Sequence, residues 1–587
     1  MNTVVGTQPD HRLGADGLDV DQAGPGRRSG LARKLPALGA VLVGTFLICA
    51  HAALYGHWLV DDAAITFDYA RNVAQGYGPV LQPGATPVEG YSNTLWLVLL
   101  VLGRWLGLFD HGLLLGIPDY VVYPKLLAAL FCAGTLVAFH QIAAVLVRRA
   151  WIVTLGAGTL LACIPSYVAW CFSGLENSLY AFLVTAIAAV TVRAIANGRM
   201  TSVVPAVTTG LLAFGAALTR PDGMIFAVSF PIVALLLITR ASIRKTIVAA
   251  VSSLVAFAVP FGLFLLWRHA EFGRWVSNTA AAKKQALGPD AQTISAFNKI
   301  GALLSYIGVV GAVVALVVLG ATMGTPSVFR RRFVGALVPF ALAISAFGIL
   351  NPDWMTQLRF ATPIWAMGSL VVTVGAYRVL ASTALRTRVV CGLAIVAALT
   401  TSLTLLKQQE TAFRIAPTVP MCLVADSAGR LINELADELK LADKESYVGP
   451  DLGGSALTSR LRVVDLAGLT DARIADYRAN GDVAGLSEYI FGEVRPAFIH
   501  AEKAWKIVGW DARLDTDYDF LDTTDPAKGG MYVRKDLVHG QAELDHLRTF
   551  EQSEIKVIFD RYNQAPRASC GSQLVTGQVL GASAGTR

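Results

Sequence analysis

Charged residues are scarce in this 587-residue chain. They make up 16% of it, hydrophobic residues make up 54%, and the mean hydropathy is +0.52, whereas globular proteins carry about 25% charged residues. The chain also lacks the G-x-x-x-x-G-K-[ST], H-E-x-x-H and C-x-x-C motifs, and its nine histidines are scattered. These absences argue against a nucleotide-driven pump, a metalloprotease and a dithiol redox protein, and no metal site is predicted. The composition indicates a polytopic α-helical membrane protein.

A cleavable signal peptide is also missing. Residues 1–34 have no apolar core and end in basic residues, which is typical of a disordered cytoplasmic tail before a retained first helix. The net charge of +7 is unevenly divided, because residues 407–587 hold 21 basic and 27 acidic residues, which leaves 28 basic and 15 acidic residues in the first 406. The basic surplus therefore belongs to the membrane domain, 35–406, and does not indicate a nucleic-acid partner.

Eleven apolar runs are long enough to span a bilayer, at about 20 residues each. They centre on residues 36–57, 122–147, 151–169, 175–195, 202–218, 223–239, 246–266, 298–320, 333–350, 361–379 and 389–406. With the N-terminus inside, every even-numbered span returns to a basic cluster, as the positive-inside rule requires. Another apolar run, 94–109, would break this pattern if it crossed, so we expect an interfacial or re-entrant helix there.

In this topology every carboxylate between residues 35 and 406 lies on the outer side. One explanation for this bias is that the outer loops are simply longer than the inner ones. The alternative is that the outer loops form a functional surface, held in position by the helices. The first outer loop, 59–120, opens with "WLVDDAAITFDYARN", which predicts a short interfacial helix that begins at Asp61. Asp61 and Asp62 either cap that helix, or form a carboxylate pair that attracts a cation or accepts a hydroxyl proton.

Other outer segments carry groups suited to a sugar and to a phosphate. The candidates for binding a sugar are Glu89, Tyr91, Asn93, Asp222, Asn278 and Asp353. The cations Arg220, Lys283 and Arg359 lie at the level of the lipid headgroups, where they either anchor helix ends or bind the phosphate of a lipid carrier. Glu176, at a turn between two spans, either lines the same cavity or caps a helix.

Residues 407–587 have the hydropathy of a soluble domain, placed outside by the eleventh span. Short apolar runs at 488–493, 496–501, 531–538 and 555–560 predict strands, and 428–442 predicts an amphipathic helix, which together indicate a small α/β or α+β domain. Cys422 and Cys570 lie near its two ends, so we predict a disulfide between them in this oxidising compartment. The glycine-rich stretch 449–471 either makes turns or receives an acceptor glycan.

Six stretches, in this order, resemble one known superfamily. They are "DDAAITFDYARN", "VEGYSNTLW", "LTRPDG", "SNTAAAKK", "DWMTQLRF" and "VVDLAGLTDARIA". Together they resemble the type C (GT-C) glycosyltransferases, and within them the mycobacterial terminal β-(1→2)-arabinofuranosyltransferases and their bacterial relatives. The resemblance implies a GT-C fold with about eleven transmembrane helices, a catalytic carboxylate at Asp61 or Asp62, a polyprenyl-phosphate sugar donor and an outer domain that helps to hold the acceptor.

The hypothesis from sequence is therefore a glycosyltransferase of the bacterial plasma membrane. It would transfer arabinofuranose from the lipid phosphate to a cell-wall arabinan, with Asp61 or Asp62 as base and Arg220, Lys283 and Arg359 on the phosphate. Two alternatives remain: another sugar on the same fold, such as mannose to protein or aminoarabinose to lipid A, and a lipid-linked glycan transporter with a sensor domain. No cofactor is predicted, and the need for a divalent cation is left open.

Overall fold

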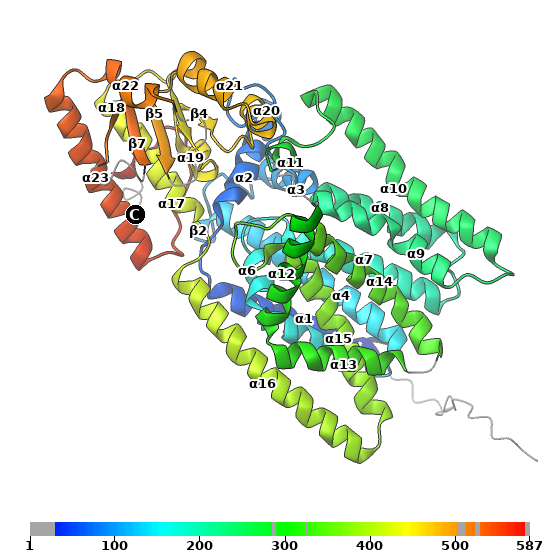
Figure 1. Ribbon diagram of the computed structural model, residues 1–587. Coiled ribbons are helices and arrows are strands. Elements are labelled where there is room, and N and C mark those ends of the chain that lie inside the picture. Colours follow the sequence, from blue (N-terminus) through cyan, green and yellow to red (C-terminus); the bar gives the residue numbers. More distant parts are fainter. Residues whose placement is uncertain (1–29, 284–288, 325–326, 503–510, 523–528, 582–587) are drawn as a thin grey trace, which may run out of the picture.

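The computed structural model describes residues 30–283, 289–324, 327–502, 511–522 and 529–581. It consists of a helical bundle with a smaller C-terminal domain at one end (Figure 1). We call this domain the outer domain, and the end of the bundle next to it the outer end, after the location that the sequence predicts. Most of the predicted tail, residues 1–29, lies outside the described residues. Helix α1 (Gly30–Ala53) already begins at Gly30, a few residues before the predicted boundary.

Seven helices in the described part of the chain are long and apolar enough to cross a membrane. They are α1, α4 (Asp119–Leu146), α7 (Asn177–Ala196), α10 (Ile243–Phe272), α14 (Ser327–Ile349), α15 (Thr362–Ser382) and α16 (Leu385–Ile415). Two bent pairs raise the number to nine: α5 (Ala150–Ala162) with α6 (Pro165–Cys171), and α12 (Pro289–Ile307) with α13 (Val309–Met323). The shorter apolar helices α8 (Val203–Thr219) and η1 with α9 (Pro221–Val228 and Ser229–Leu236) occupy the two remaining predicted spans.

Two of the predicted spans are broken, and each break has a local cause. The bend of 82° between α5 and α6 falls just before Pro165, which cannot continue the hydrogen bonding of the preceding helix. The bend of 99° between α12 and α13 falls at Gly308, whose φ of +82° suits glycine. The first break matters for function, because it places α6 and the turn after it at the outer end of the bundle.

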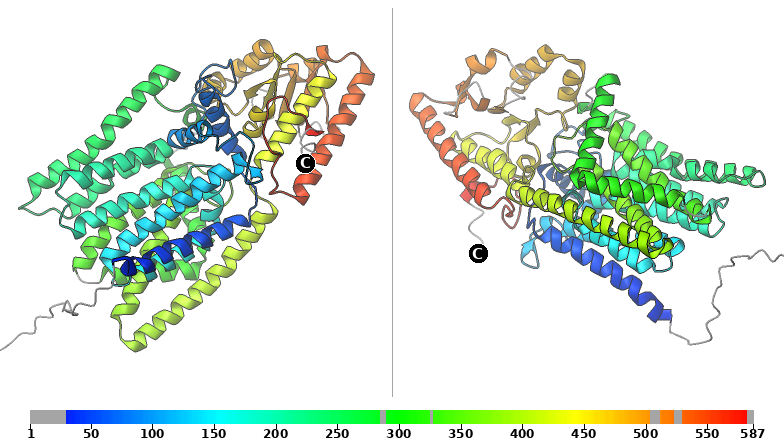
Figure 2. Two further views of the ribbon diagram at one scale, coloured as in Figure 1. Left: turned by 180° about the vertical axis from the view of Figure 1, so that it is seen from behind. Right: turned by 60° about the horizontal axis from the view of Figure 1, so that its bottom comes forward.

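Small residues allow close contacts between the membrane helices. A Cβ atom on Gly158 of α5 would lie 3.3 Å from the Cα atom of Gly44 in α1, so larger side chains would push these helices apart. This is the packing expected in lipid, where close backbone approach replaces the hydrophobic effect between helices. Helix α16 runs along the outside of the bundle and leads into the outer domain (Figure 2).

The first outer loop forms two helices between the bundle and the outer domain. Helix α2 (Asp61–Ala74) begins at the predicted residue, and α3 (Thr94–Trp105) has 12 residues, too few to cross a bilayer. A small hairpin of β1 (Leu113–Leu114) and β2 (Ile117–Pro118) follows. The apolar run at 94–109 is thus a short helix, as its exclusion from the spans predicts.

The outer domain contains a five-stranded mixed sheet in the order β4-β3-β5-β7-β6. Its strands are β3 (Ser446–Gly449), β4 (Arg462–Asp465), β5 (Phe498–Glu502), β6 (Tyr518–Phe520) and β7 (Gly529–Arg534). Strand β3 pairs in parallel with β4 and β5, whereas β7 is antiparallel to β5 and β6. Helices cover both faces of the sheet, which makes the domain an α/β unit.

Alternate residues of the strands face two different hydrophobic clusters. Tyr447 and Phe498 belong to the cluster that includes α18 (Leu431–Glu438) and α23 (Gln541–Gln564). Their neighbours Val448 and Ile499 belong to the cluster with α20 (Ala472–Asn480) and α21 (Val483–Glu488). The first cluster continues into the bundle without a break, so the outer domain is packed firmly onto the membrane domain.

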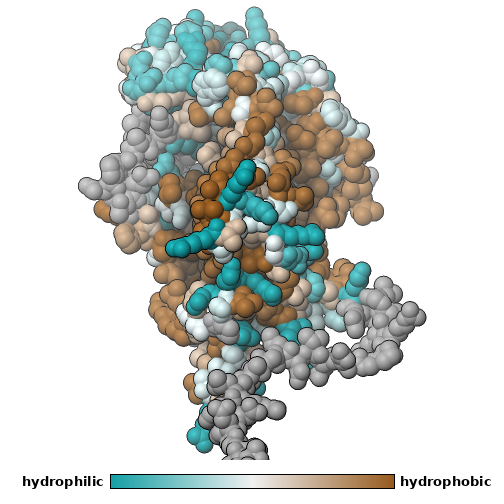
Figure 3. Space-filling view, turned by 90° about the vertical axis from the view of Figure 1, so that its right-hand side faces the viewer, coloured by the Kyte–Doolittle hydropathy of each residue, from teal (hydrophilic) through white to brown (hydrophobic). Residues whose placement is uncertain are grey.

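Two of the predicted strands in the outer domain are correct and two are wrong. The segments 496–501 and 531–538 contain most of β5 and most of β7. In contrast, 488–493 covers the last residue of α21 and most of a short π-helix, and 555–560 lies inside α23. The predicted pair of cysteines is bonded, with a Cα–Cα distance of 5.0 Å. It links α17 (Met421–Ala425) to the C-terminal segment. In Figure 3 the hydrophilic surface of the outer domain gives way to a broad hydrophobic surface over the bundle.

Candidate functional site

A cavity of about 240 Å³ lies where the first outer loop meets the outer ends of the bundle helices. Seven of the residues predicted to form a site line it, together with Glu176: Asp62, Tyr91, Asn93, Arg220, Asp222, Lys283 and Arg359. They come from segments up to about 300 residues apart in the sequence. We call it the front cavity.

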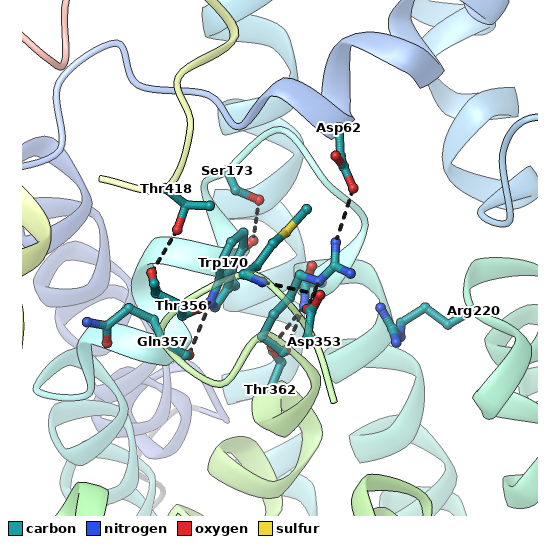
Figure 4. Close-up of polar contacts among 12 residues, drawn as sticks. Asp62, Trp170, Ser173, Arg220, Asp353, Thr356, Gln357, Thr362 and Thr418 are labelled. Carbon is teal, nitrogen blue, oxygen red and sulfur yellow. Dashed lines mark hydrogen bonds and ion pairs between the residues drawn. The ribbon is translucent and has the colours of Figure 1, made fainter. Parts of the chain in front are cut away.

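Asp62 is the carboxylate that faces this cavity from the first turn of α2. Its side chain is 21% exposed, and its Oδ2 atom lies 3.9 Å from the Nη1 atom of Arg359. Figure 4 shows Asp62 above the polar cluster, with Arg220 pointing toward the same space. A carboxylate with solvent access and only a distant ion pair is free to accept a proton from a bound hydroxyl group.

Two further contacts, besides the one with Asp62, hold Arg359 in place. Its Nε atom donates to Asp353 at 2.7 Å, and its guanidinium group lies 4.8 Å from the centre of the Phe360 ring. The residue follows Gln357 and Leu358, which both have positive φ values, of 61° and 47°. This tight turn at the start of α15 directs the guanidinium group into the front cavity.

Arg220 contacts the same ring, with its guanidinium group 4.5 Å from the centre of Phe360. It pairs with Asp222 at 3.0 Å and with Glu176 at 3.2 Å. The second carboxylate oxygen of Glu176 accepts from Asn93 at 2.9 Å. Two arginines thus contact one aromatic ring, and buried or partly buried carboxylates fix the direction of both.

Lys283 completes the cationic lining of the cavity. Its side chain is exposed, and no ion-pair partner for it is found among the described residues. Together with the two arginines it supplies the positive charge that a phosphate group requires. The cavity therefore combines one accessible carboxylate with three cations.

Asp61 lies elsewhere, although it is the neighbour of Asp62. It is buried, and its two carboxylate oxygens accept from the backbone N–H groups of Gly453, at 3.0 Å, and Gly454, at 2.7 Å. Burial raises the pKa of Asp61 well above its usual value, and these hydrogen bonds oppose that shift. Its contacts join the first outer loop to the helix α19 (Gly453–Thr458) of the outer domain.

Three predicted sugar ligands serve as supports instead of lining the cavity. Glu89 forms an ion pair with Arg268 at 2.6 Å, and Asn278 donates to the carbonyl groups of Gly468 and Leu469. Asp353 holds Arg359, as described above. All three tie the walls of the front cavity to one another.

Sequence reasoning left the role of Glu176 open and missed Phe360. Glu176 precedes α7, but its side chain makes no capping hydrogen bond and lines the cavity. In the sequence, the feature that points to Phe360 is its position next to Arg359, in a turn between two predicted spans. Among the described residues, no group of three or more His, Cys, Asp or Glu side chains is placed to share a metal ion, so no ligand set can be named.

No known protein family and no curated protein matches the sequence. Solved structures do resemble it. The oligosaccharyltransferase AglB from Archaeoglobus fulgidus, solved with an inhibitory peptide and a dolichol-phosphate, aligns with a TM-score of 0.50 and 10% identity over 81% of this chain and 70% of its own. ArnT from Cupriavidus metallidurans, bound to undecaprenyl phosphate, aligns with a TM-score of 0.49 and 13% identity over 87% of this chain and all of its own. The chain is a multi-pass membrane protein with the GT-C fold.

Proposed function

We propose that this chain is a membrane glycosyltransferase that takes its sugar from a polyprenyl phosphate at the front cavity. The sugar is arabinofuranose and the acceptor is a cell-wall arabinan, as the sequence motifs indicate. The site faces the outer side of the bacterial plasma membrane. The observation that supports this most strongly is the presence of Asp62, Arg220, Arg359 and Lys283 in one cavity at the outer ends of the membrane helices.

Each group has a defined part in the reaction. An acceptor hydroxyl gives its proton to the carboxylate of Asp62 as its oxygen bonds to the anomeric carbon of the donor sugar. The bond between that carbon and the phosphate oxygen breaks, and the electron pair leaves with the polyprenyl phosphate. Arg220, Arg359 and Lys283 stabilise the negative charge that the departing phosphate gains.

The position of the cations agrees with a lipid donor. A polyprenyl chain stays in the bilayer, so its phosphate lies at the membrane surface, where the outer ends of α8 and α15 bring Arg220 and Arg359 together. The AglB structure, which shares the fold, contains a dolichol-phosphate. A transporter would instead need a polar path through the bilayer, and the polar groups here gather at one end of the bundle.

Transfer assays with the purified chain test the proposal and the identity of the sugar. Polyprenyl-phosphate arabinofuranose, mannose and aminoarabinose are each supplied with a short arabinan, a peptide and lipid A as acceptors. We expect transfer only from the arabinofuranose donor to the arabinan. Transfer of another sugar would support a glycosyltransferase but contradict the proposed donor sugar. No transfer from any donor would contradict the proposal as a whole.

A further inference from the structure

A second cavity, of about 360 Å³, lies behind α2. We call it the rear cavity. Its lining comes from α2, α3, the loop after each of them, α19 and the C-terminal segment of the outer domain, and it includes Asp68, Arg71, Gln75, Arg104, Asp110 and Gln573. Its volume is in the range of about 300–1,000 Å³ that small-ligand sites occupy.

Helix α2 forms the wall between the two cavities. Asp62, Ile65 and Thr66 line the front cavity, at positions i, i+3 and i+4, and they share one face of the helix. Asp68, Arg71, Asn72 and Gln75 line the rear cavity with the same spacing. Asp68 lies six positions after Asp62, which corresponds to a rotation of about 240° around the helix axis and a rise of about 9 Å along it. The two cavities are therefore separate sites on one short helix.

Asp68 is an unsatisfied polar group at the rear cavity. The residue is 3% exposed, and its Oδ2 atom has no hydrogen-bond partner among the described residues. A buried carboxyl oxygen without a partner costs free energy, so its retention next to a cavity indicates a ligand that supplies the missing hydrogen bond. Burial raises the pKa of Asp68 to about 8, so that at neutral pH the group both donates and accepts.

The charged cluster at the rear cavity consists of two arginines and the carboxylate of Asp110. Asp110 pairs with Arg71 at 2.7 Å and also contacts Arg104. Arg71 donates in addition to the carbonyl groups of Leu457 and Leu574. Both arginines share this one carboxylate, and among the described residues no group of acidic or histidine side chains is placed to hold a metal ion. The rest of the polar lining consists of amide, carboxyl and hydroxyl groups, which suit a ligand rich in hydroxyl groups.

The rear cavity also adjoins a larger one. A cavity of about 570 Å³ lies between the first outer loop and the edge strand β4, and it shares Gln82, Pro83 and Thr576 with the rear cavity. Gln82 crosses to this edge, where its side chain accepts from the backbone of Val463 and donates to Leu461. Two adjoining cavities between the first outer loop and the outer domain favour a linear ligand with several sugar units over a single sugar.

From these observations we infer that the rear cavity is a second, non-catalytic binding site for a neutral oligosaccharide, with Asp68 hydrogen-bonded to a sugar hydroxyl. The inference rests on the proposed function in taking that oligosaccharide to be part of the acceptor glycan. Such a site would hold a growing polymer at the enzyme between transfers, away from the reacting hydroxyl.

Binding measurements separate this inference from the catalytic proposal. The probe is a short linear oligoarabinofuranoside, titrated by calorimetry into the purified full-length chain and into its Asp62→Asn variant. This measurement detects binding and does not require sugar transfer. Gln75→Trp places a large side chain at the rear cavity from an exposed position on α2. Val557→Trp is the matched control, because Val557 is an exposed residue of α23 that lines neither cavity.

We expect saturable binding to the wild type and to Asp62→Asn. Gln75→Trp and Asp68→Leu should weaken it at least about tenfold, the effect of losing one buried hydrogen bond, whereas Val557→Trp should not. Equal binding to Gln75→Trp and the wild type, or no saturable binding by either parent, would overturn the inference. So would equally tight binding of an anionic oligogalacturonate, because the rear cavity would then not select a neutral chain. If the probe binds but no sugar is transferred, the catalytic proposal alone fails.

Discussion

Asp61 and Asp62 are adjacent in the sequence, yet their carboxylates contact different parts of the protein. Asp61 accepts two backbone hydrogen bonds from Gly453 and Gly454 in the outer domain, whereas Asp62 faces the front cavity opposite Arg359. The helix geometry explains this, because consecutive residues of a helix point about 100° apart. One carboxylate therefore docks the outer domain, and the other is available for chemistry.

Asp61→Asn should affect stability more than chemistry. The amide group of asparagine cannot accept from both Gly453 and Gly454, so one buried N–H group loses its partner, at a cost of about 1–3 kcal/mol. We expect the unfolding temperature of the purified chain to fall by a few degrees, with transfer activity reduced less than tenfold below that temperature. A loss of activity of 100-fold or more without a change in unfolding temperature would instead identify Asp61 as the base.

Lys283→Ala should weaken the use of the lipid donor. Lys283 is exposed and lines the front cavity, so its removal leaves no buried charge unpaired. We expect the KM for the polyprenyl-phosphate sugar to rise several-fold, while the KM for the acceptor and the unfolding temperature stay unchanged. A rise confined to the KM for the acceptor would contradict its role in phosphate binding.

Arg220→Ala and Arg359→Ala should have the same effect on the donor at an additional cost in stability. Each arginine is buried and paired with carboxylates, Arg220 with Glu176 and Asp222 and Arg359 with Asp353. Breaking a buried ion pair typically costs about 3–5 kcal/mol. We expect lower unfolding temperatures together with weaker donor binding, measured at a temperature where each variant remains folded. Unaltered donor binding in either variant would remove that arginine from the phosphate site.

The disulfide should stabilise the outer domain strongly. Cys422 and Cys570 are 148 residues apart in the sequence, and closing a loop of that length stabilises a protein by up to about 5 kcal/mol in the chain-entropy account. Cys570→Ser should therefore lower the unfolding temperature and remove the difference in mobility between reducing and non-reducing gels. Identical unfolding temperatures of wild type and variant would show that the bond does not form.

Asp68 should make the protein less stable as the pH rises. Its pKa is raised to about 8 by burial, with Arg71 opposing the shift and Asp110 adding to it. In the unfolded chain the group ionises near pH 4, so the folded state loses stability between about pH 4 and pH 8. Asp68→Asn has no such group, so its unfolding temperature should rise relative to the wild type from pH 5 to pH 9. A constant difference between the two proteins over that range would mean that the Asp68 carboxyl is already ionised in the folded protein at pH 5.

The membrane domain could be predicted from sequence in most respects. Apolar length and the basic clusters give the eleven helical segments, and the carboxylates of the outer loops identify the region of the site. The breaks at Pro165 and Gly308 were not predicted, because each lies within an apolar run that is long enough to span as a whole. Strands at 488–493 and 555–560 were wrongly predicted, since short apolar runs fit a helix or a strand equally well and tertiary packing decides between them.

Seven of the residues that line the front cavity could be predicted as candidates, but their arrangement could not. Sequence gives no means of telling Asp61 from Asp62, because their separation depends on the outer domain residues Gly453 and Gly454, almost 400 positions away. The supporting roles of Glu89 and Asn278 also depend on partners in distant segments, Arg268 and the carbonyl group of Gly468. Residue type indicates chemistry, but only the fold decides which groups face the cavity.

The central claim is that Asp62 accepts the proton of the acceptor hydroxyl. The most direct test is the single-turnover rate of sugar transfer from a polyprenyl-phosphate donor, measured at saturating donor and acceptor for the wild type and for Asp62→Asn. We predict that Asp62→Asn expresses and unfolds like the wild type but transfers the sugar about 100-fold more slowly or worse. A transfer rate within a few-fold of the wild type would contradict the account.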